Sequence, residues 1–355
     1  MKRAFFLIFI VTFFFASFLT PSLLLAQTKK NAAPTPLVPP KQPTTGINLT
    51  VSPVFLSLIT DPGKNISTSI RVQNNNNETE YLRLELARFV PVADGNPVIA
   101  DVEKEDEFAK WISFSPSEFV LLPNESKNVK VSIDPSDDAA LGYYYAIVVD
   151  RIQEAGDEKS PVVAGSPAIP VLLEVRSPNA SREVQILDFK TDKAIYEYLP
   201  TEFEIKLKNT GNIHSSPIGD IFIDSGDDKD IAIIQVNGGK GNVLPQSTRV
   251  FKATWEDGFA VRVPKMNDGQ VVKDKDGKAT YETKYDFTKA NKFRIGKYTA
   301  NLLLIYDNGE RDIPLEAKVS FWIIPWKILL IATGILLFAL LGIRSTIMSM
   351  RKGRS

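Results

Sequence analysis

Short runs in which apolar and polar residues alternate fill the chain between Ile47 and Phe321. In the first half they include residues 66–72, 82–86, 129–133 and 169–175. Successive side chains of a strand point to opposite faces, so this alternation predicts β-strands with one buried face. Each run is bounded by Asn, Gly or Pro, as strands are, and only residues 100–110 could form a helical turn or two. The pattern predicts an all-β fold.

The second half of the chain repeats the landmarks of the first in the same order. The matched segments are residues 71–74 with 206–209, 122–126 with 244–248, and 141–146 with 295–300. We therefore expect one immunoglobulin-like β-sandwich used twice, over residues 47–176 and 183–321. In the Gly-Tyr segments we expect the Tyr to pack in the core and to bind a neighbouring loop through its hydroxyl. Tyr144 should point away from the face shared by Tyr143 and Tyr145.

The N-terminus has the order of a secretory signal peptide. Lys2 and Arg3 precede an apolar stretch, and Ala26 is a suitable last residue, which gives a signal peptide over residues 1–26. An uncleaved membrane anchor is the alternative, because the residues before Ala26 fit a cleavage site imperfectly. Residues 27–46 are rich in proline and predict a linker of polyproline type.

A second apolar segment, residues 322–343, predicts one C-terminal transmembrane helix. At 1.5 Å per residue it spans roughly 33 Å, enough for the hydrocarbon core. Trp322 and Trp326 are placed for the membrane interface, and Lys327 can extend its ammonium back to the head groups. Residues 344–355 carry bases and no acid, which predicts a cytoplasmic tail and an extracellular body. The basic residues of this tail are Arg344, Arg351, Lys352 and Arg354.

Composition excludes several classes of function. The chain carries 42 basic and 42 acidic residues, and a net charge of zero argues against a nucleic-acid partner. It has no Cys and one His, His214, so thiolate chemistry and two-His metal sites are excluded. No phosphate loop or dinucleotide motif is present. We expect no cofactor and no catalytic residues, and the absent disulfide favours a bacterial surface protein.

Two acidic segments are the candidate sites. Asp224, Asp227, Asp228 and Asp230 lie in one loop and could bind Ca²⁺, although a solvated turn is the alternative interpretation. Residues 101–107 hold five acids, which would suit a glycoside hydrolase if two of them faced each other across a cleft. A solvated short helix is the alternative there.

Residues 256–292 form an insertion in the second half. Alternation over 259–263 and 281–285, with Asp276-Gly277 as a turn between them, predicts a two-stranded arm. Such an arm is either a surface for contact with a partner or a mobile decoration.

The arrangement resembles the WxL-interacting proteins of Gram-positive surfaces. The residues that carry the resemblance are 51–53, 71–75 and 141–144 in the first half and 244–247, 251–255 and 296–298 in the second. The resemblance implies that the first domain associates with peptidoglycan and the second with a partner or host molecule. The first domain also resembles pilus chaperones, and the second resembles bacterial cell-adhesion modules.

Three functions remain open from the sequence. The preferred hypothesis is a membrane-anchored, non-enzymatic surface protein that binds wall polymer or another surface protein. The second is a carboxylate-dependent glycoside hydrolase, which would need an acid pair in a deep pocket. The third is an assembly factor that offers an edge strand to an exported partner, and it would need a long unpaired edge strand in the first domain.

Overall fold

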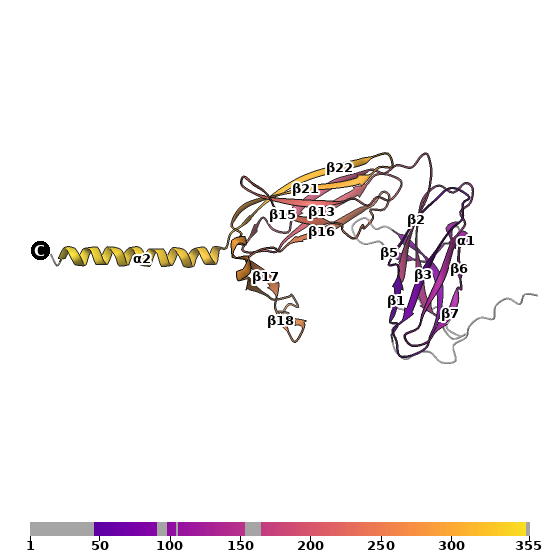
Figure 1. The fold of residues 1–355 in the computed structure, drawn as a ribbon, viewed down its shortest axis with the longest axis horizontal. Coiled ribbons are helices and arrows are strands. Elements are labelled where there is room, and N and C mark those ends of the chain that lie inside the picture. Colours follow the sequence, from indigo (N-terminus) through magenta and orange to yellow (C-terminus); the bar gives the residue numbers. More distant parts are fainter. Residues whose placement is uncertain (1–45, 91–97, 104–105, 153–164, 353–355) are drawn as a thin grey trace, which may run out of the picture. The chain divides into compact units, whose positions relative to one another are not determined.

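The computed structural model describes residues 46–90, 98–103, 106–152 and 165–352. The predicted signal peptide and nearly all of the predicted linker lie outside the described residues, as does Arg354. The chain forms two tandem immunoglobulin-like β-sandwiches and one apolar C-terminal helix, as the alternation predicts (Figure 1).

Sandwich one contains the strands β1 to β10, arranged in two sheets. The first sheet has the order β1-β3-β8-β6, and the second has the order β2-β10-β9-β4-β5 with β7 paired to β4. A short helix, α1 (Phe108–Trp111), lies where the sequence allows a helical turn. The strand bounds are β1 Leu49–Ser52, β2 Leu56–Thr60, β3 Ile66–Asn74, β4 Glu80–Val90, β5 Val98–Ala100, β6 Ile112–Ser115, β7 Glu118–Leu121, β8 Ser126–Ile133, β9 Leu141–Arg151 and β10 Ala168–Val175.

Sandwich two follows the same plan, with sheets of order β11-β13-β16 and β12-β22-β21-β14-β15. Its strand bounds are β11 Val184–Thr191, β12 Ile195–Tyr196, β13 Thr201–Asn209, β14 Ile218–Ser225, β15 Asp228–Val236, β16 Thr248–Trp255, β21 Gly296–Asp307 and β22 Asp312–Ile323.

The first strand of each sandwich is split between the two sheets. In sandwich one, β1 pairs antiparallel with β3, and β2 then pairs parallel with β10. In sandwich two, β11 pairs antiparallel with β13, and β12 pairs parallel with β22. The repeat seen in the sequence therefore extends to the strand pairing.

Alternation places one face of each strand in a closed core. In β10, Ile169, Val171, Leu173 and Val175 are all 0% exposed, and they pack in the core of sandwich one. The core of sandwich two is centred on Trp255, which is 1% exposed. Burial of these apolar faces is the main stabilising contribution to each sandwich.

Tyrosines at the start of the penultimate strands bind the backbone three residues earlier. The Tyr143 hydroxyl accepts from the Ala140 N–H at 3.2 Å, and the Tyr298 hydroxyl accepts from the Ile295 N–H at 3.0 Å. Tyr143 and Tyr145 pack in the core of sandwich one, while Tyr144 points to the other face, as predicted. The alignment of residues 141–146 with 295–300 pairs Gly142 with Gly296 and Tyr144 with Tyr298. The hydrogen bonds show that this alignment is wrong by one position, because Tyr143 corresponds to Tyr298.

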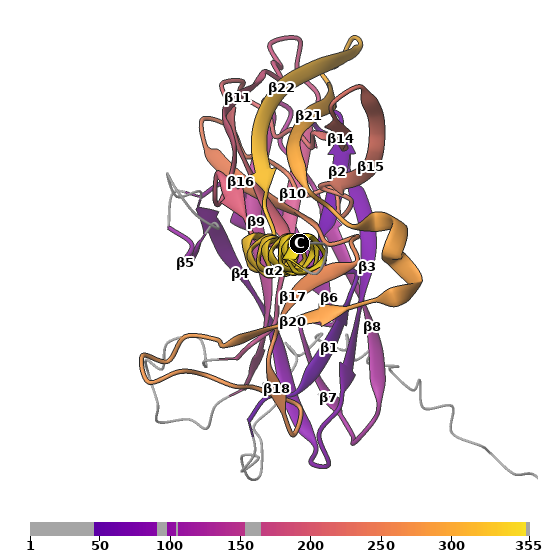
Figure 2. The same cartoon turned by 90° about the vertical axis from the view of Figure 1, so that its left-hand side faces the viewer.

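The insertion forms an arm, residues 256–292, that runs out from sandwich two (Figure 2). As the alternation predicts, β17 (Ala260–Pro264) pairs antiparallel with β20 (Tyr281–Tyr285). Gly277 lies in the expected turn, with φ +77°. A second small hairpin, β18 (Met266–Asn267) with β19 (Gln270–Val271), was not expected, and a 3-10 helix, η1 (Phe287–Lys292), closes the arm.

The apolar helix α2 spans Trp326–Lys352. Within the described part of the chain one helix, over Trp326–Ser345 with a mean hydropathy of 2.3, is long and apolar enough to span a membrane. The predicted start of the helix at Trp322 is wrong, because Trp322 lies in β22 and pairs with Ile195 and Lys297. Pro325 separates strand from helix, since its ring cannot continue the ladder but suits a helix start.

Candidate binding pocket at the base of the arm

Residues 192–200, here called the strap, join the end of β22 to the base of the arm. On one side, the Trp322 N–H donates to the Ala194 carbonyl at 2.9 Å, and the Ile324 N–H donates to the Tyr196 carbonyl at 2.7 Å. These bonds continue the parallel pairing of β12 with β22. The strap is thereby held beside the residues that lead into α2.

On its other side the strap binds the arm. The Arg262 N–H donates to the Leu199 carbonyl at 2.6 Å, and Leu199 forms a parallel bridge with Val261. The ring centroids of Tyr198 and Tyr285 lie 6.3 Å apart in an edge-to-face arrangement. An isolated hairpin is only marginally stable in water, so these contacts explain why the arm is ordered at its base.

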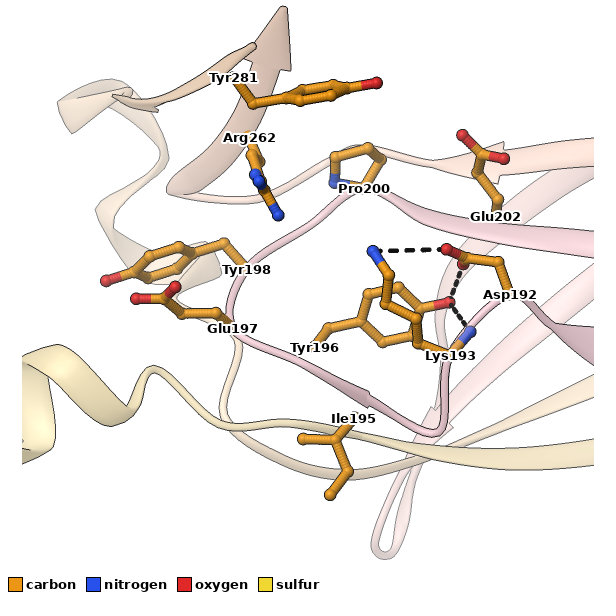
Figure 3. Close-up of a pocket in the computed structure, with 10 residues that line it drawn as sticks. All are labelled: Asp192, Lys193, Ile195, Tyr196, Glu197, Tyr198, Pro200, Glu202, Arg262 and Tyr281. Carbon is orange, nitrogen blue, oxygen red and sulfur yellow. Dashed lines mark hydrogen bonds and ion pairs between the residues drawn. The ribbon is translucent and has the colours of Figure 1, made fainter. Parts of the chain in front are cut away.

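An open pocket of about 450 Å³ lies between the strap and the arm (Figure 3). Its floor comes from the strap and the first residues of β13, and Arg262 and Tyr281 of the arm form the facing wall. The lining residues are Asp192, Lys193, Ile195, Tyr196, Glu197, Tyr198, Pro200, Glu202, Arg262 and Tyr281.

Three acids and two bases share this pocket, and several are paired. The Tyr196 hydroxyl donates to the Asp192 carboxylate and accepts from the Lys193 N–H at 3.1 Å. Glu197 Oε2 accepts from Lys327 Nζ, in the first turn of α2, at 3.0 Å. Glu197 Oε1 is buried and has no partner among the described residues.

The strap tyrosines are neutral hydrogen-bonding groups at physiological pH. Burial, with the Tyr285 hydroxyl as a second cause, raises the pKa of Tyr198 to about 12. Burial, with the hydrogen bond to Asp192 as a second cause, also raises the pKa of Tyr196. Both rings keep their protons far above neutral pH, so the floor presents phenol groups rather than phenolates.

Arg262 is positioned by an aromatic ring. Its guanidinium carbon lies 5.0 Å from the centroid of Tyr281, within the range of a cation–π contact. Figure 3 shows the guanidinium directed from the arm toward the strap. No ion pair to Arg262 occurs within the described ranges, so this side chain has donors available for an anionic group.

The loop proposed from the sequence as a calcium site is a tight strand connection. Asp224 lies at the end of β14 and Asp228 and Asp230 at the start of β15. Asp224 already accepts from Lys229 Nζ at 3.0 Å, the Asp230 N–H at 3.1 Å and Asn301 Nδ2 at 2.9 Å. In the part of the chain that the structure describes, no three acidic or His side chains converge as a metal site. The four carboxylates Asp224, Asp227, Asp228 and Asp230 are thus not brought together.

Acidic side chains of residues 101–107 attach this segment to sandwich one. Asp106 accepts from the Tyr145 hydroxyl at 3.0 Å and from the Glu103 N–H at 2.8 Å, and Glu103 pairs with Arg88. Glu105 lies outside the described residues. These bonds give Glu103 and Asp106 a structural role beside β4 and β9.

The described residues that were predicted to anchor the chain in a membrane lie in β22 and in α2. Trp322 ends β22, whereas Trp326 and Lys327 open α2 with the Lys327 ammonium 5.3 Å from the Trp326 ring. Arg344 is an exposed residue of α2. Arg351 and Lys352 belong to the last turn of the helix.

Sequence patterns do not single out the residues that line the pocket. The available signal was the segment 196–200, where aromatic and acidic residues precede a proline at the start of a strand. Nothing in that segment indicates that Arg262 of the arm, more than sixty residues later, folds back over it. The site depends on a long-range contact that periodicity does not report.

No protein-family model matches this chain, and no curated protein matches it either. Solved structures similar in fold include the class 5 fimbriae chaperone CfaA, with 12% identity, coverage of 76% of this chain and 98% of that chain, and a TM-score of 0.36. The CsuC–CsuE chaperone–tip subunit complex of Acinetobacter baumannii matches with 11% identity, 76% and 97% coverage and a TM-score of 0.34. The YadV chaperone matches with 10% identity, 77% and 100% coverage and a TM-score of 0.34.

Proposed function

We propose that this protein is a membrane-anchored, non-enzymatic binding protein of the cell surface. In this proposal α2 spans the membrane, the two sandwiches lie outside and the tail lies inside, in line with the positive charge that follows the span. The ligand is wall polymer or a segment of another surface protein. The observation that carries the proposal is the pocket of about 450 Å³ beneath the arm, lined by neutral tyrosines and by charges of both signs.

The chemistry of the pocket suits a ligand with both an amine and a carboxylate. Arg262 offers donors to an anionic group, and charge-assisted bonds of this kind are among the strongest in proteins. Glu202 lies on the opposite side of the pocket and can accept from a cationic group. Peptides and peptide-bearing wall polymers carry both groups.

The hydrolase hypothesis is less well supported by the same geometry. Glycoside hydrolysis needs one carboxyl group to donate a proton and a second to act across the bond. Of the three acids in the pocket, Asp192 is held by the Tyr196 hydroxyl and Glu197 by the Lys327 ammonium. Both acids are therefore committed to structural contacts.

The edge strands of sandwich one are short, which does not favour the edge-strand hypothesis. Its edge strands β1, β2, β5 and β6 have between three and five residues in the described chain. In sandwich two, β22 has 12 residues and carries β12 on its outer side at Ile195 and Tyr196. The edge strands β11, β15 and β16 of sandwich two have eight or nine residues, so an assembly function by strand addition would involve sandwich two rather than sandwich one.

The test is binding of full-length protein in detergent to purified wall polymer and to surface-protein extract. Arg262→Ala should weaken binding about 10-fold or more, because it removes a charge-assisted hydrogen bond. The matched control is Lys273→Ala, an exposed cation of the same arm outside the pocket. Equal binding by both variants and the wild type would refute the pocket as the binding site.

A further inference from the structure

An exposed group of aromatic rings lies where the arm returns to sandwich two. The ring of Phe259 lies 5.5 Å from Phe287, 5.7 Å from Tyr285 and 6.0 Å from Phe293, measured between centroids. Phe287, in the 3-10 helix η1, is 79% exposed, the highest value of any large hydrophobic residue that the structure describes. An apolar side chain held outward on an ordered turn marks an interaction surface.

The strap places this aromatic cluster near the start of the apolar helix. Tyr196 binds the backbone of Ile324, and Leu199, three residues on, binds the arm. Three extended residues span at most about 11 Å, so these two attachments are close in space. Tyr198 contacts Tyr285, which lies two residues before Phe287. The arm and the residues that lead into α2 are therefore attached to sandwich two through the same strap.

We propose that the aromatic cluster, with Phe287 at its tip, rests in the interfacial layer of a phospholipid bilayer, as a second membrane contact beside α2. The proposal rests on the proposed membrane anchoring. It is supported by Trp322 and Trp326, which are 45% and 50% exposed and flank the entry to the helix. Aromatic side chains favour the membrane–water interface, and a helix that leaves the body at this point brings the bilayer to it.

The contact is apolar rather than electrostatic. The two lysines of η1 share one acid, because Asp257 pairs with Lys289 at 3.0 Å and also with Lys292, so the three groups together keep one positive charge. Attraction of free lysines to anionic lipid would be screened by salt, whereas burial of an apolar ring is not. The cluster should therefore contact the bilayer in high salt and without anionic lipid.

Site-directed spin labelling tests the proposal cleanly, because the chain contains no Cys. Phe287→Cys places one label at the tip, and Ile233→Cys places a matched label on β15, at a hydrophobic residue that is 60% exposed in the same sandwich. Full-length protein is reconstituted in phosphatidylcholine vesicles, and retention after an alkaline wash verifies anchoring separately.

The label at 287 should be accessible to oxygen and protected from a water-soluble nickel chelate, while the label at 233 remains accessible to the chelate. High salt should not change this difference. Equal chelate access at both positions, in protein that resists the alkaline wash, overturns the inference and leaves anchoring intact. Protection at 287 that appears only at high protein density, or only with an added protein partner, also overturns it, because the surface then binds a protein and not the bilayer.

Discussion

Asn74 and Asn209 occupy the same position in the two sandwiches and make the same hydrogen bonds. Asn74 ends β3 and Asn209 ends β13, and each is 0% exposed. Asn74 Nδ2 donates to the Leu121 carbonyl at 3.2 Å, and Asn209 Nδ2 donates to the Val243 carbonyl at 2.9 Å. Each amide therefore fastens a strand end to the Leu-Pro turn of its own sandwich.

The turns themselves match as well. Each amide oxygen accepts from the N–H two residues later, that of Asn76 at 2.8 Å and that of Gly211 at 2.9 Å. After the two prolines, Asn124 and Gln246 both have positive φ, at 62° and 57°. The internal repeat is therefore a repeat of a specific hydrogen-bonded corner, beyond the shared strand order.

Replacing either asparagine should destabilise one sandwich only. Asn74→Ala and Asn209→Ala each leave buried carbonyl groups without a donor, at a cost of about 2–4 kcal/mol in the free energy of unfolding. Calorimetry should show a lower melting temperature for the affected sandwich and an unchanged melting temperature for the other sandwich. Asn77→Ala, at an exposed residue near the first corner, is the control and should change neither transition. A loss of stability as small as that caused by Asn77→Ala would contradict the role of these asparagines in fastening the strand ends.

Glu80 and Arg151 form a buried ion pair in sandwich one. Their side chains are 0% and 10% exposed, with Arg151 Nε 2.7 Å from Glu80 Oε2. Removal of one partner leaves a buried charge, so Glu80→Ala should cost about 3–5 kcal/mol by chemical denaturation. Glu85→Ala, which breaks an exposed pair with Arg83, should cost about 0–1 kcal/mol. Similar losses of stability in the two variants would show that the buried pair contributes no more than the exposed pair.

Acid should loosen the base of the arm. Hydrogen bonds from Lys292, and then from Lys289, lower the pKa of Asp257 from its usual value. A carboxyl group with a lowered folded pKa contributes stability above its unfolded pKa of about 4 and loses it as pH falls through the folded value. Wild type should therefore lose stability relative to Asp257→Asn below about pH 4, in thermal melts at matched pH. A constant difference from neutral to acid pH would disprove this linkage.

Removal of divalent metal should leave the fold unchanged. Asp224 already accepts three hydrogen bonds, and those from Lys229 and the Asp230 N–H lower its pKa. EDTA should therefore not change the melting temperature, whereas Asp224→Asn should lower it slightly by weakening the β14–β15 turn. A marked fall with EDTA would restore the calcium hypothesis for the four aspartates.

Topology can be checked by proteolysis of intact, wall-stripped cells. With the body outside, added protease should digest both sandwiches and spare an epitope placed after Ser355, because the basic residues that follow the span favour the cytoplasmic side. Permeabilised cells provide the control in which the epitope is also lost. A protected body in intact cells would reverse the proposed orientation.

Alternation and turn residues were sufficient to predict both sandwiches, the repeat and the arm, because each depends on local patterns of apolar and turn-forming residues. The boundary at Trp322 could not be predicted, since an apolar residue that ends a buried strand looks the same as one that begins a span. The pocket could not be predicted because Arg262 and Tyr281 reach the strap only after the arm has folded back. Periodicity reports which face of a strand is buried, but not which distant surface covers it.

The parallel pairing of the strap with the end of β22 has a mechanical consequence. In the proposed topology, a pull on the body against α2 enters sandwich two through Ile323, at the end of β22. That strand is held by 12 residue pairs on the β21 side and by the Ala194 and Tyr196 carbonyls on the other. Force along a strand axis loads these bonds in shear, so that they resist together instead of opening one at a time. In the proposed topology, the connection between sandwich two and the membrane is thus built to withstand tension.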